Sequence, residues 1–237
     1  MKAYQKNYGS NTYSSSDPLR KFSHATRFNL ALSLVDLPDR AHVLDFGCGD
    51  GAFLHLLKKA RPAQGNFDAV LFEPYMSVEQ SPSFSIATEW EDVILASEHR
   101  PFDLVICQEV MEHFAPHRQD EALHRIKQVM QPDATLLLSV PVELGLVALV
   151  KNLGRWKYRR NSTEIYNFRN LLMSVFAIPI PDTRAGDGYL SHMGFYFTDF
   201  HKILNRHFFI EYMVGSPFRG LPLILNSQVF FRARPRA

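Results

Sequence analysis

Short apolar runs alternate with helix-like segments through the first two thirds of the chain. Each run is rich in Val, Leu, Ile, Phe or Ala and is bounded by polar or glycine residues; the runs are 41–46, 69–72, 84–88, 104–107 and 135–140. Apolar runs of this length are typical of buried parallel strands. Residues 52–59 and 119–130 between them have the apolar spacing of helices. This alternation predicts an α/β fold with a mostly parallel sheet.

The C-terminal third follows a different pattern. Residues 207–214 and 226–232 are two apolar runs with no helix between them, which favours an antiparallel pair of strands. Residues 144–190 are too long for a simple connection, so we expect a helical cap inserted in the domain. Residues 20–34 predict a helix before the first strand. Residues 131–134 predict a turn before the run at 135–140, and Thr198 is the expected N-cap of a later helix.

A glycine-rich turn joins the first strand to the following helix. The run Asp45-x-Gly47-Cys48-Gly49-x-Gly51 lies between them. Glycines let the backbone approach a ligand closely, and the first turn of the helix leaves free N–H groups beside it. The turn therefore predicts a site for a nucleotide-like ligand.

Two enzyme classes share such a turn. The spacing Gly47-x-Gly49-x-x-Ala52 fits the dinucleotide pattern of oxidoreductases. Asp45, however, is an acid inside the strand, and it suits a cationic ligand better than a pyrophosphate. With this acid and three glycines, the run resembles motif I of the class I methyltransferases that depend on S-adenosylmethionine (SAM). A turn that holds no ligand is the plainer alternative.

Further residues match landmarks of the same family. Glu73-Pro74 ends the second strand, where a carboxylate can accept hydrogen bonds from both ribose hydroxyls, as it also does in dinucleotide enzymes. The run from Phe102 to Phe114 resembles the family motif after the fourth strand. The resemblance puts Gln108 beside the methionine part of SAM, and it makes Glu109 to His113 the turn below it.

The adenine site is less sharply defined. The resemblance implies that the loop after the third strand holds the adenine, and Glu89 and Trp90 are the candidates there. Alternatively, Trp90 is an ordinary packed aromatic residue with no contact to a ligand. In the segment after the fourth strand, Glu112 and His113 are alternatively the first turn of a helix, without a role in the site. The predicted cofactor-binding residues are Asp45, Gly47, Cys48, Gly49, Gly51, Glu73, Pro74, Glu89, Trp90, Gln108 and Glu109.

The resemblance also implies the architecture. It predicts a doubly wound, seven-stranded, mostly parallel sheet of order 3-2-1-4-5-7-6, in a single domain over residues 1–237. The cap insertion at 144–190 would cover the site, and residues 1–20 would form an N-terminal lid. Tyr8 and Tyr13 are its candidate contacts with SAM.

Composition and charge indicate which kinds of partner are not expected. A net charge of +2 does not favour nucleic acid, and no apolar run reaches the roughly 20 residues that span a bilayer. No signal sequence is recognisable, so we expect a cytoplasmic protein. The two cysteines predict reduced thiols, and no histidine spacing fits a metal site. These features do not define an oligomeric state.

The resemblance implies transfer of the SAM methyl group to a small acceptor, and we expect an oxygen atom to receive it. His192, His113 and Glu143 are the candidate catalytic bases. Short strings similar to bacterial glycan and lipid pathway methyltransferases favour an acceptor of that kind. The basic aromatic stretch within 144–160 predicts either a solvated helix face or a patch that receives an anionic substrate or touches a membrane surface. The alternatives are a nucleotide-dependent oxidoreductase and a SAM-binding protein without catalysis.

Overall fold

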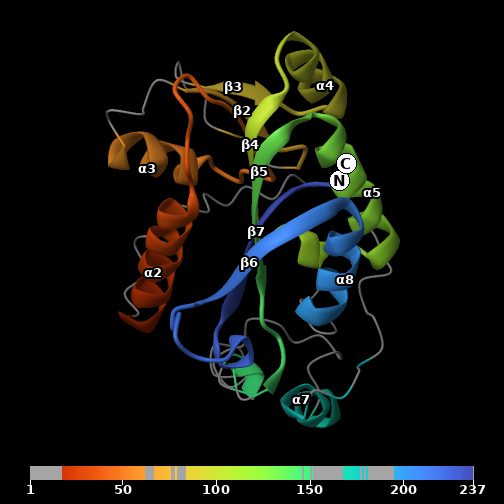
Figure 1. The fold of residues 1–237 in the computed structure, drawn as a ribbon. Coiled ribbons are helices and arrows are strands. Elements are labelled where there is room, and N and C mark those ends of the chain that lie inside the picture. Colours follow the sequence, from red (N-terminus) through yellow and green to blue (C-terminus); the bar gives the residue numbers. More distant parts are fainter. Residues whose placement is uncertain are drawn as a thin grey trace.

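The computed structural model shows a seven-stranded sheet with helices on both faces (Figure 1). It describes residues 18–61, 67–75, 78, 84–145, 147–149, 151, 168–176, 178, 180 and 195–236. The strand order is β3-β2-β1-β4-β5-β7-β6, which confirms the predicted order.

Five parallel strands form the centre and one edge of the sheet. They are β1 (His42–Phe46), β2 (Asp68–Phe72), β3 (Ser85–Ala87), β4 (Phe102–Gln108) and β5 (Met130–Pro141). The other edge is antiparallel and consists of β7 (Gln228–Pro235) and β6 (Phe208–Ser216). The carboxyl ends of the parallel strands therefore share one edge of the sheet, where α/β proteins bind ligands.

Described helices cover both faces of the sheet (Figure 1). On the first face lie α2 (Pro18–Leu34) and α3 (Ala52–Ala60). On the second lie α4 (Trp90–His99), α5 (Pro116–Gln128) and α8 (Phe197–His207). Short 3-10 turns occur at η1 (Met111–His113) and η2 (Leu223–Leu225). Helix α7 (Phe168–Val175) lies at the lower end of the molecule.

The core consists of two apolar layers separated by the sheet. Leu44, Val105 and Leu136 face α4, α5 and α8, whereas Val43 and Leu104 face α2 and α3. All five are completely buried. Neighbouring residues of β1 and β4 thus enter opposite layers, which explains why these strands are continuous apolar runs rather than alternating ones.

Two local predictions were wrong. Residues 131–134 do not form a turn before β5. They lie inside the strand, where the pairing with β4 shifts register between Phe102 and Leu104. Pairing with the neighbouring strand has overridden the turn preference of Pro132 and Asp133. Thr198 is not the N-cap of α8, because the helix begins one residue earlier and Tyr196 occupies the cap position.

Several predicted features fall outside the described residues. These include residues 1–17 of the expected lid, most of the cap insertion at 144–190, and His192. Residues 18–20 already belong to α2, and the described part of the insertion contains α7. Among the described helices, none has both the length and the apolar character required to cross a bilayer.

Candidate functional site

The glycine turn closes directly on the end of β2. The backbone N–H groups of Gly47 and Cys48 both donate to the carbonyl oxygen of Phe72, over 2.9 and 3.3 Å. Gly47, Gly49 and Gly51 all have positive φ angles, of 73°, 59° and 74°. This region is costly for residues with a side chain, so the conformation of the turn depends on its glycines.

Gly47 and Gly49 have different surroundings. A Cβ atom added to Gly47 would lie 2.4 Å from the side chain of Val110, so this glycine allows the turn to pack on the segment after β4. A Cβ atom added to Gly49 would have no atom within 4 Å. Gly49 therefore faces open space, which a ligand could occupy.

Glu73 connects the end of β2 to the glycine turn. Its Oε2 accepts a hydrogen bond from the backbone N–H of Gly49 over 3.1 Å, and its Oε1 accepts one from the N–H of Tyr75 over 3.1 Å. The side chain is almost fully buried. These contacts fix the carboxylate beside Gly49, at the carboxyl end of β2.

Asp45 is a buried acid at the centre of the sheet. It pairs with Leu71 of β2 and Ile106 of β4, and only 4% of its surface is exposed. Burial, together with the nearby negative charges of Glu73 and Asp50, raises its pKa to about 7. A carboxyl group in such a setting gains most from a cationic partner.

Trp90 and Glu89 lie where the adenine site was predicted. The Trp90 ring packs edge-on against Phe46 and Phe72, with centroid distances of 5.9 and 5.4 Å. It is therefore held against the carboxyl ends of β1 and β2, which fits both the packing role and an apolar wall for a ring. Glu89 and Pro74 are exposed nearby.

The segment after β4 presents acidic groups to the same edge. Gln108 ends the strand, and Glu109 follows with a φ of 57°, which is rare for a residue with a side chain. Glu112 and His113 lie in the 3-10 turn η1, and Glu112 is completely buried. Burial raises the pKa of Glu112 and lowers the pKa of His113.

The structure adds Arg27 and Gln228, which the sequence pattern did not indicate, and gives partners to Lys151 of the predicted basic stretch. Arg27 of α2 places its NH1 atom 3.8 Å from Oε2 of Glu109, and the side chain of Gln228 of β7 helps to lower the pKa of the same carboxyl group. Lys151 donates to Glu143 over 3.2 Å, and also to the carbonyl oxygens of Val142 and Ser227, each over 2.9 Å. These residues, with Glu109 and Glu143, form a charged cluster at the ends of β4, β5 and β7.

The cysteines do not form a reactive pair. Cys107 is buried in the core, and Cys48 lies in the glycine turn with its thiol directed to the carbonyl oxygen of Gly49. Burial raises the pKa of both thiols, so both are neutral at physiological pH. Cys48 can therefore contact a ligand through its backbone groups and through van der Waals packing, but not as a thiolate.

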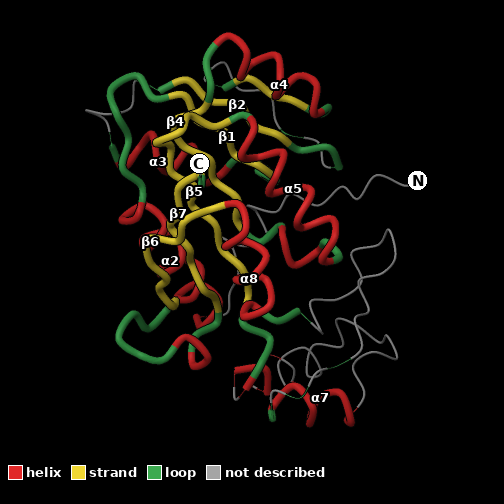
Figure 2. The backbone as a smooth tube through the Cα atoms, turned by 45° about the vertical axis from the view of Figure 1, so that its right-hand side comes forward, coloured by secondary structure: helices red, strands yellow, loops and turns green. Residues whose placement is uncertain are grey.

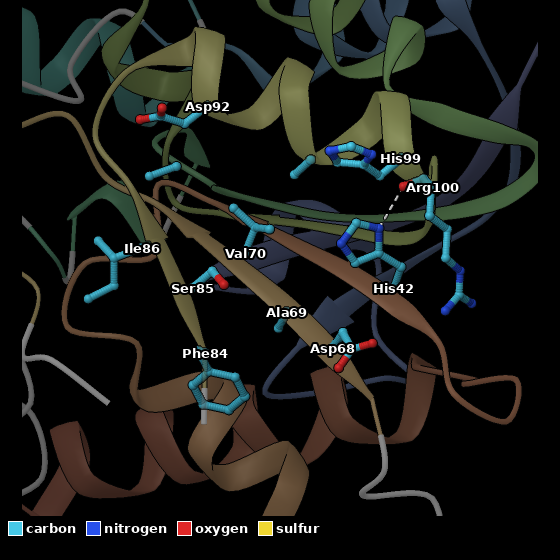
Figure 3. A pocket seen from close by; sticks show the side chains of 12 residues that line it. His42, Asp68, Ala69, Val70, Phe84, Ser85, Ile86, Asp92, His99 and Arg100 are labelled. Atoms are coloured by element: carbon cyan, nitrogen blue, oxygen red, sulfur yellow. Dashed lines mark hydrogen bonds between the residues drawn. The ribbon is translucent and has the colours of Figure 1, made fainter. Parts of the chain in front are cut away.

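A separate pocket lies beneath α4, over β2 and β3 (Figure 3). His42 and Asp68, at the starts of β1 and β2, lie toward one end of it, and Asp92 lies toward the other. Its lining includes none of the residues predicted to bind a cofactor or to act in catalysis. We therefore assign the candidate site to the carboxyl edge of the sheet.

Comparison with known families agrees with this geometry. The family model described as a methyltransferase domain matches residues 19–172, which is more than half of the chain. The chain therefore belongs to this methyltransferase family, as predicted from the glycine turn and the segment after β4. It is a SAM-dependent enzyme of this class rather than the alternative oxidoreductase.

Solved structures of low sequence identity share the fold. The PH0226 protein from Pyrococcus horikoshii OT3 is 17% identical, with a TM-score of 0.59 and full coverage of both chains. A putative S-adenosylmethionine dependent methyltransferase from Listeria monocytogenes is 15% identical, with a TM-score of 0.56 over 90% of this chain and 100% of that one. Magnesium protoporphyrin IX methyltransferase from Synechocystis PCC 6803 with bound SAH is 16% identical, with a TM-score of 0.54 over 94% and 89%. No curated protein sequence matches significantly.

Removal of the Glu73 carboxylate should weaken SAM binding. We expect Glu73→Ala to lower the affinity at least about tenfold, because hydrogen bonds to a charged group contribute roughly 1.5–3 kcal/mol. Calorimetric titration with SAM measures the change. Glu91→Ala, which removes an exposed carboxylate from the first turn of α4, is the control and should have no effect. An unchanged dissociation constant in folded Glu73→Ala protein would remove Glu73 from the site.

Affinity for SAM should also depend on pH through Asp45. Below its pKa of about 7 the side chain is neutral and must lose a proton before it can pair with a cationic amino group. The dissociation constant should therefore rise as the pH falls from about 7.5 to about 5.5, approaching roughly tenfold per unit at the acid end. In Asp45→Asn, binding should be weaker and should not vary over this range. An equal pH dependence in both proteins would show that another group titrates.

Proposed function

We propose that this enzyme transfers the methyl group of SAM to a hydroxyl group of a small acceptor from a cell-surface glycan or lipid pathway, and that it acts in the cytoplasm. The observation that carries the hydroxyl assignment is the partly buried carboxylate of Glu109, directly after β4, whose Oε1 atom is buried. The fold and the family establish the methyltransferase class, whereas the acceptor and the residue roles below are parts of this proposal.

The glycine turn and its neighbours fit SAM. Glu73 would accept hydrogen bonds from the ribose hydroxyls, and Asp45 would neutralise the cationic amino group. The open space at Gly49 would admit the ligand close to the backbone, and Trp90 with Glu89 would border the adenine. SAM supplies an activated methyl group on a sulfonium, so the protein's main task is to align the acceptor with it.

Glu109 has the surroundings of a proton acceptor. Its Oε1 is buried and accepts no hydrogen bond from the described residues, while Arg27 lies beside the other oxygen. Burial raises the pKa of Glu109, and the charges of Arg27 and Lys151 oppose this increase. A carboxylate whose pKa lies nearer to neutrality is a stronger base than an exposed one. The left-handed backbone of Glu109 is consistent with a functional position.

The proposed reaction is an in-line methyl transfer in which one carboxylate takes up the released proton. The acceptor oxygen forms a bond to the methyl carbon while the bond from that carbon to sulfur breaks. The sulfonium becomes a neutral thioether, and the hydroxyl proton moves to the carboxylate of Glu109. Arg27, whose NH1 atom lies 3.8 Å from Oε2 of Glu109, would stabilise this carboxylate in its ionised form.

The bases predicted from sequence differ in their surroundings. Glu143 forms a 3.2 Å ion pair with Lys151, so its carboxylate is already paired with a cation of the protein. His113 is partly buried and its pKa is lowered, so its imidazole is neutral at pH 7 and can accept a proton. His192 lies outside the described residues. His113 is thus the alternative to Glu109 that the structure favours most.

A panel of acceptors tests the proposal. The purified protein would be incubated with methyl-labelled SAM and with sugar nucleotides, polyols, phenols, lipid alcohols and primary amines. We expect label to appear as base-stable ethers in hydroxyl compounds. Transfer to amines alone would contradict the oxygen assignment, and transfer to phenols alone would contradict the glycan or lipid assignment.

A further inference from the structure

Exposed apolar side chains gather at one end of the molecule. Helix α7 and the residue after it expose Leu172 and Phe176, and 71% of the Phe176 surface is accessible. The connection between β6 and β7 exposes Phe218, Leu221 and Leu225, of which the first two are 50% and 47% accessible. Both views place α7 and this connection at the same lower end of the molecule, opposite α4 (Figures 1 and 2). Large exposed apolar groups close together mark an interaction surface.

The charged residues described at this end have one sign. Residues 168–176, 178, 180 and 216–228 include no acidic residue, although the chain has 24. They include Arg169 and Arg219, and both are exposed. A net charge of only +2 for the whole chain makes this a local asymmetry. Basic residues mixed with exposed Phe and Leu fit the interface of an anionic bilayer.

The same end adjoins the edge of the sheet that carries the candidate site. The N–H of Val142, directly after β5, donates to the carbonyl oxygen of Ser227, and Gly145 lies against Ile224. The connection between β6 and β7 is thus packed on the carboxyl end of β5. The backbone of this connection is itself secured, because Oδ1 of Asn226 accepts a 2.7 Å hydrogen bond from the N–H of Phe218. The apolar tip is therefore presented by a fixed loop.

We infer that this end of the protein, formed by residues 168–178 and 217–225, docks on a lipid bilayer that carries anionic headgroups. The apolar side chains of Phe176, Phe218 and Leu221 enter the boundary between headgroups and acyl chains, and the basic residues lie against the headgroups. This surface is distinct from the predicted contact at 144–160, of which Lys151 donates its hydrogen bonds within the protein. Docking in this orientation would bring the candidate site close to the membrane surface, and it does not depend on the chemistry of the acceptor.

Vesicle co-sedimentation tests the inference. Wild-type protein should sediment with vesicles of phosphatidylcholine containing about 30% phosphatidylglycerol, and binding should weaken in pure phosphatidylcholine and at high salt. The double variant Phe218→Ser, Leu221→Ser should lose at least about tenfold in partition coefficient, because two exposed apolar side chains no longer leave water on binding. Its SAM affinity, measured by calorimetry, should stay at the wild-type value.

A matched control lies at the opposite end of the molecule. Ile94 and Leu95 of α4 are 39% and 56% exposed, so Ile94→Ser, Leu95→Ser removes a similar apolar surface and should leave vesicle binding unchanged. Equal losses in the two double variants would overturn the inference, as would wild-type protein that remains in the supernatant with anionic vesicles. Dimerisation that requires Phe218 and Leu221, seen by light scattering without vesicle binding, would assign the surface to a second copy of the chain instead.

Discussion

Replacement of Gly49 by valine is expected to lower SAM affinity at least about a hundredfold and to leave the protein folded. A side chain at this position meets no protein atom within 4 Å, so it projects into the space that the ligand would use. Added methyl groups in a filled site cost up to about 3 kcal/mol, which corresponds to this change in affinity. The left-handed backbone at Gly49 adds roughly 1–2 kcal/mol of strain, which a domain with 5–15 kcal/mol of stability tolerates.

Gly47 provides a comparison that separates loss of the cofactor site from damage to the fold. Gly47→Val would force a side chain into Val110, so this variant should melt at a lower temperature and lose binding through damage to the fold. Gly220 faces open space in the connection between β6 and β7, and Gly220→Ala should bind SAM normally. Thermal melting and calorimetry on the three variants separate the effects. Wild-type affinity in folded Gly49→Val would show that the turn does not hold the cofactor.

The parts of the fold that the sequence predicted are those determined by short-range patterns. The apolar runs that became β1 and β2 were placed to within one residue, because burial on both faces requires continuous apolar residues. The glycine turn and the acid at the end of β2 were recognisable for a similar reason, because each is defined by its position relative to a neighbouring strand in the sequence. The bulged start of β5 was missed, since Pro132 and Asp133 favour a turn and only pairing with β4 overrides that preference.

The acceptor side could not be predicted in this way. Arg27, Gln228 and Glu109 come from α2, β7 and the end of β4, and they meet only because the sheet is wound in this order. Arg27 occupies a helix position beside Phe28, where an arginine is ordinarily solvated. Lys151 was recognised as basic, but its three hydrogen bonds are with groups on other segments. Contacts of this kind leave no periodic signal along the chain.

The second large effect is expected in turnover, when Glu109 of the charged cluster at the ends of β4, β5 and β7 is replaced. Glu109→Gln should reduce kcat by about 10²- to 10⁴-fold on the acceptor found in the panel, because the amide cannot take up the hydroxyl proton. Its shape and its contacts with Arg27 and Gln228 are largely kept, so SAM affinity should change less than about threefold. A matched Glu143→Gln variant should lose much less turnover, since the carboxylate of Glu143 is occupied by Lys151.

The pH profile distinguishes a base from a residue that only supports the site. Burial raises the pKa of Glu109, and the carboxylate must be ionised to act, so turnover should fall as the pH decreases through this raised pKa. That acid limb should be absent in Glu109→Gln, whose residual rate would not depend on the ionisation of this side chain. Arg27→Gln removes a nearby positive charge, so it should raise the pKa of Glu109 further and move the acid limb to higher pH. An acid limb that stays in place in both variants would assign proton transfer to another group, with His113 the first to test by His113→Gln.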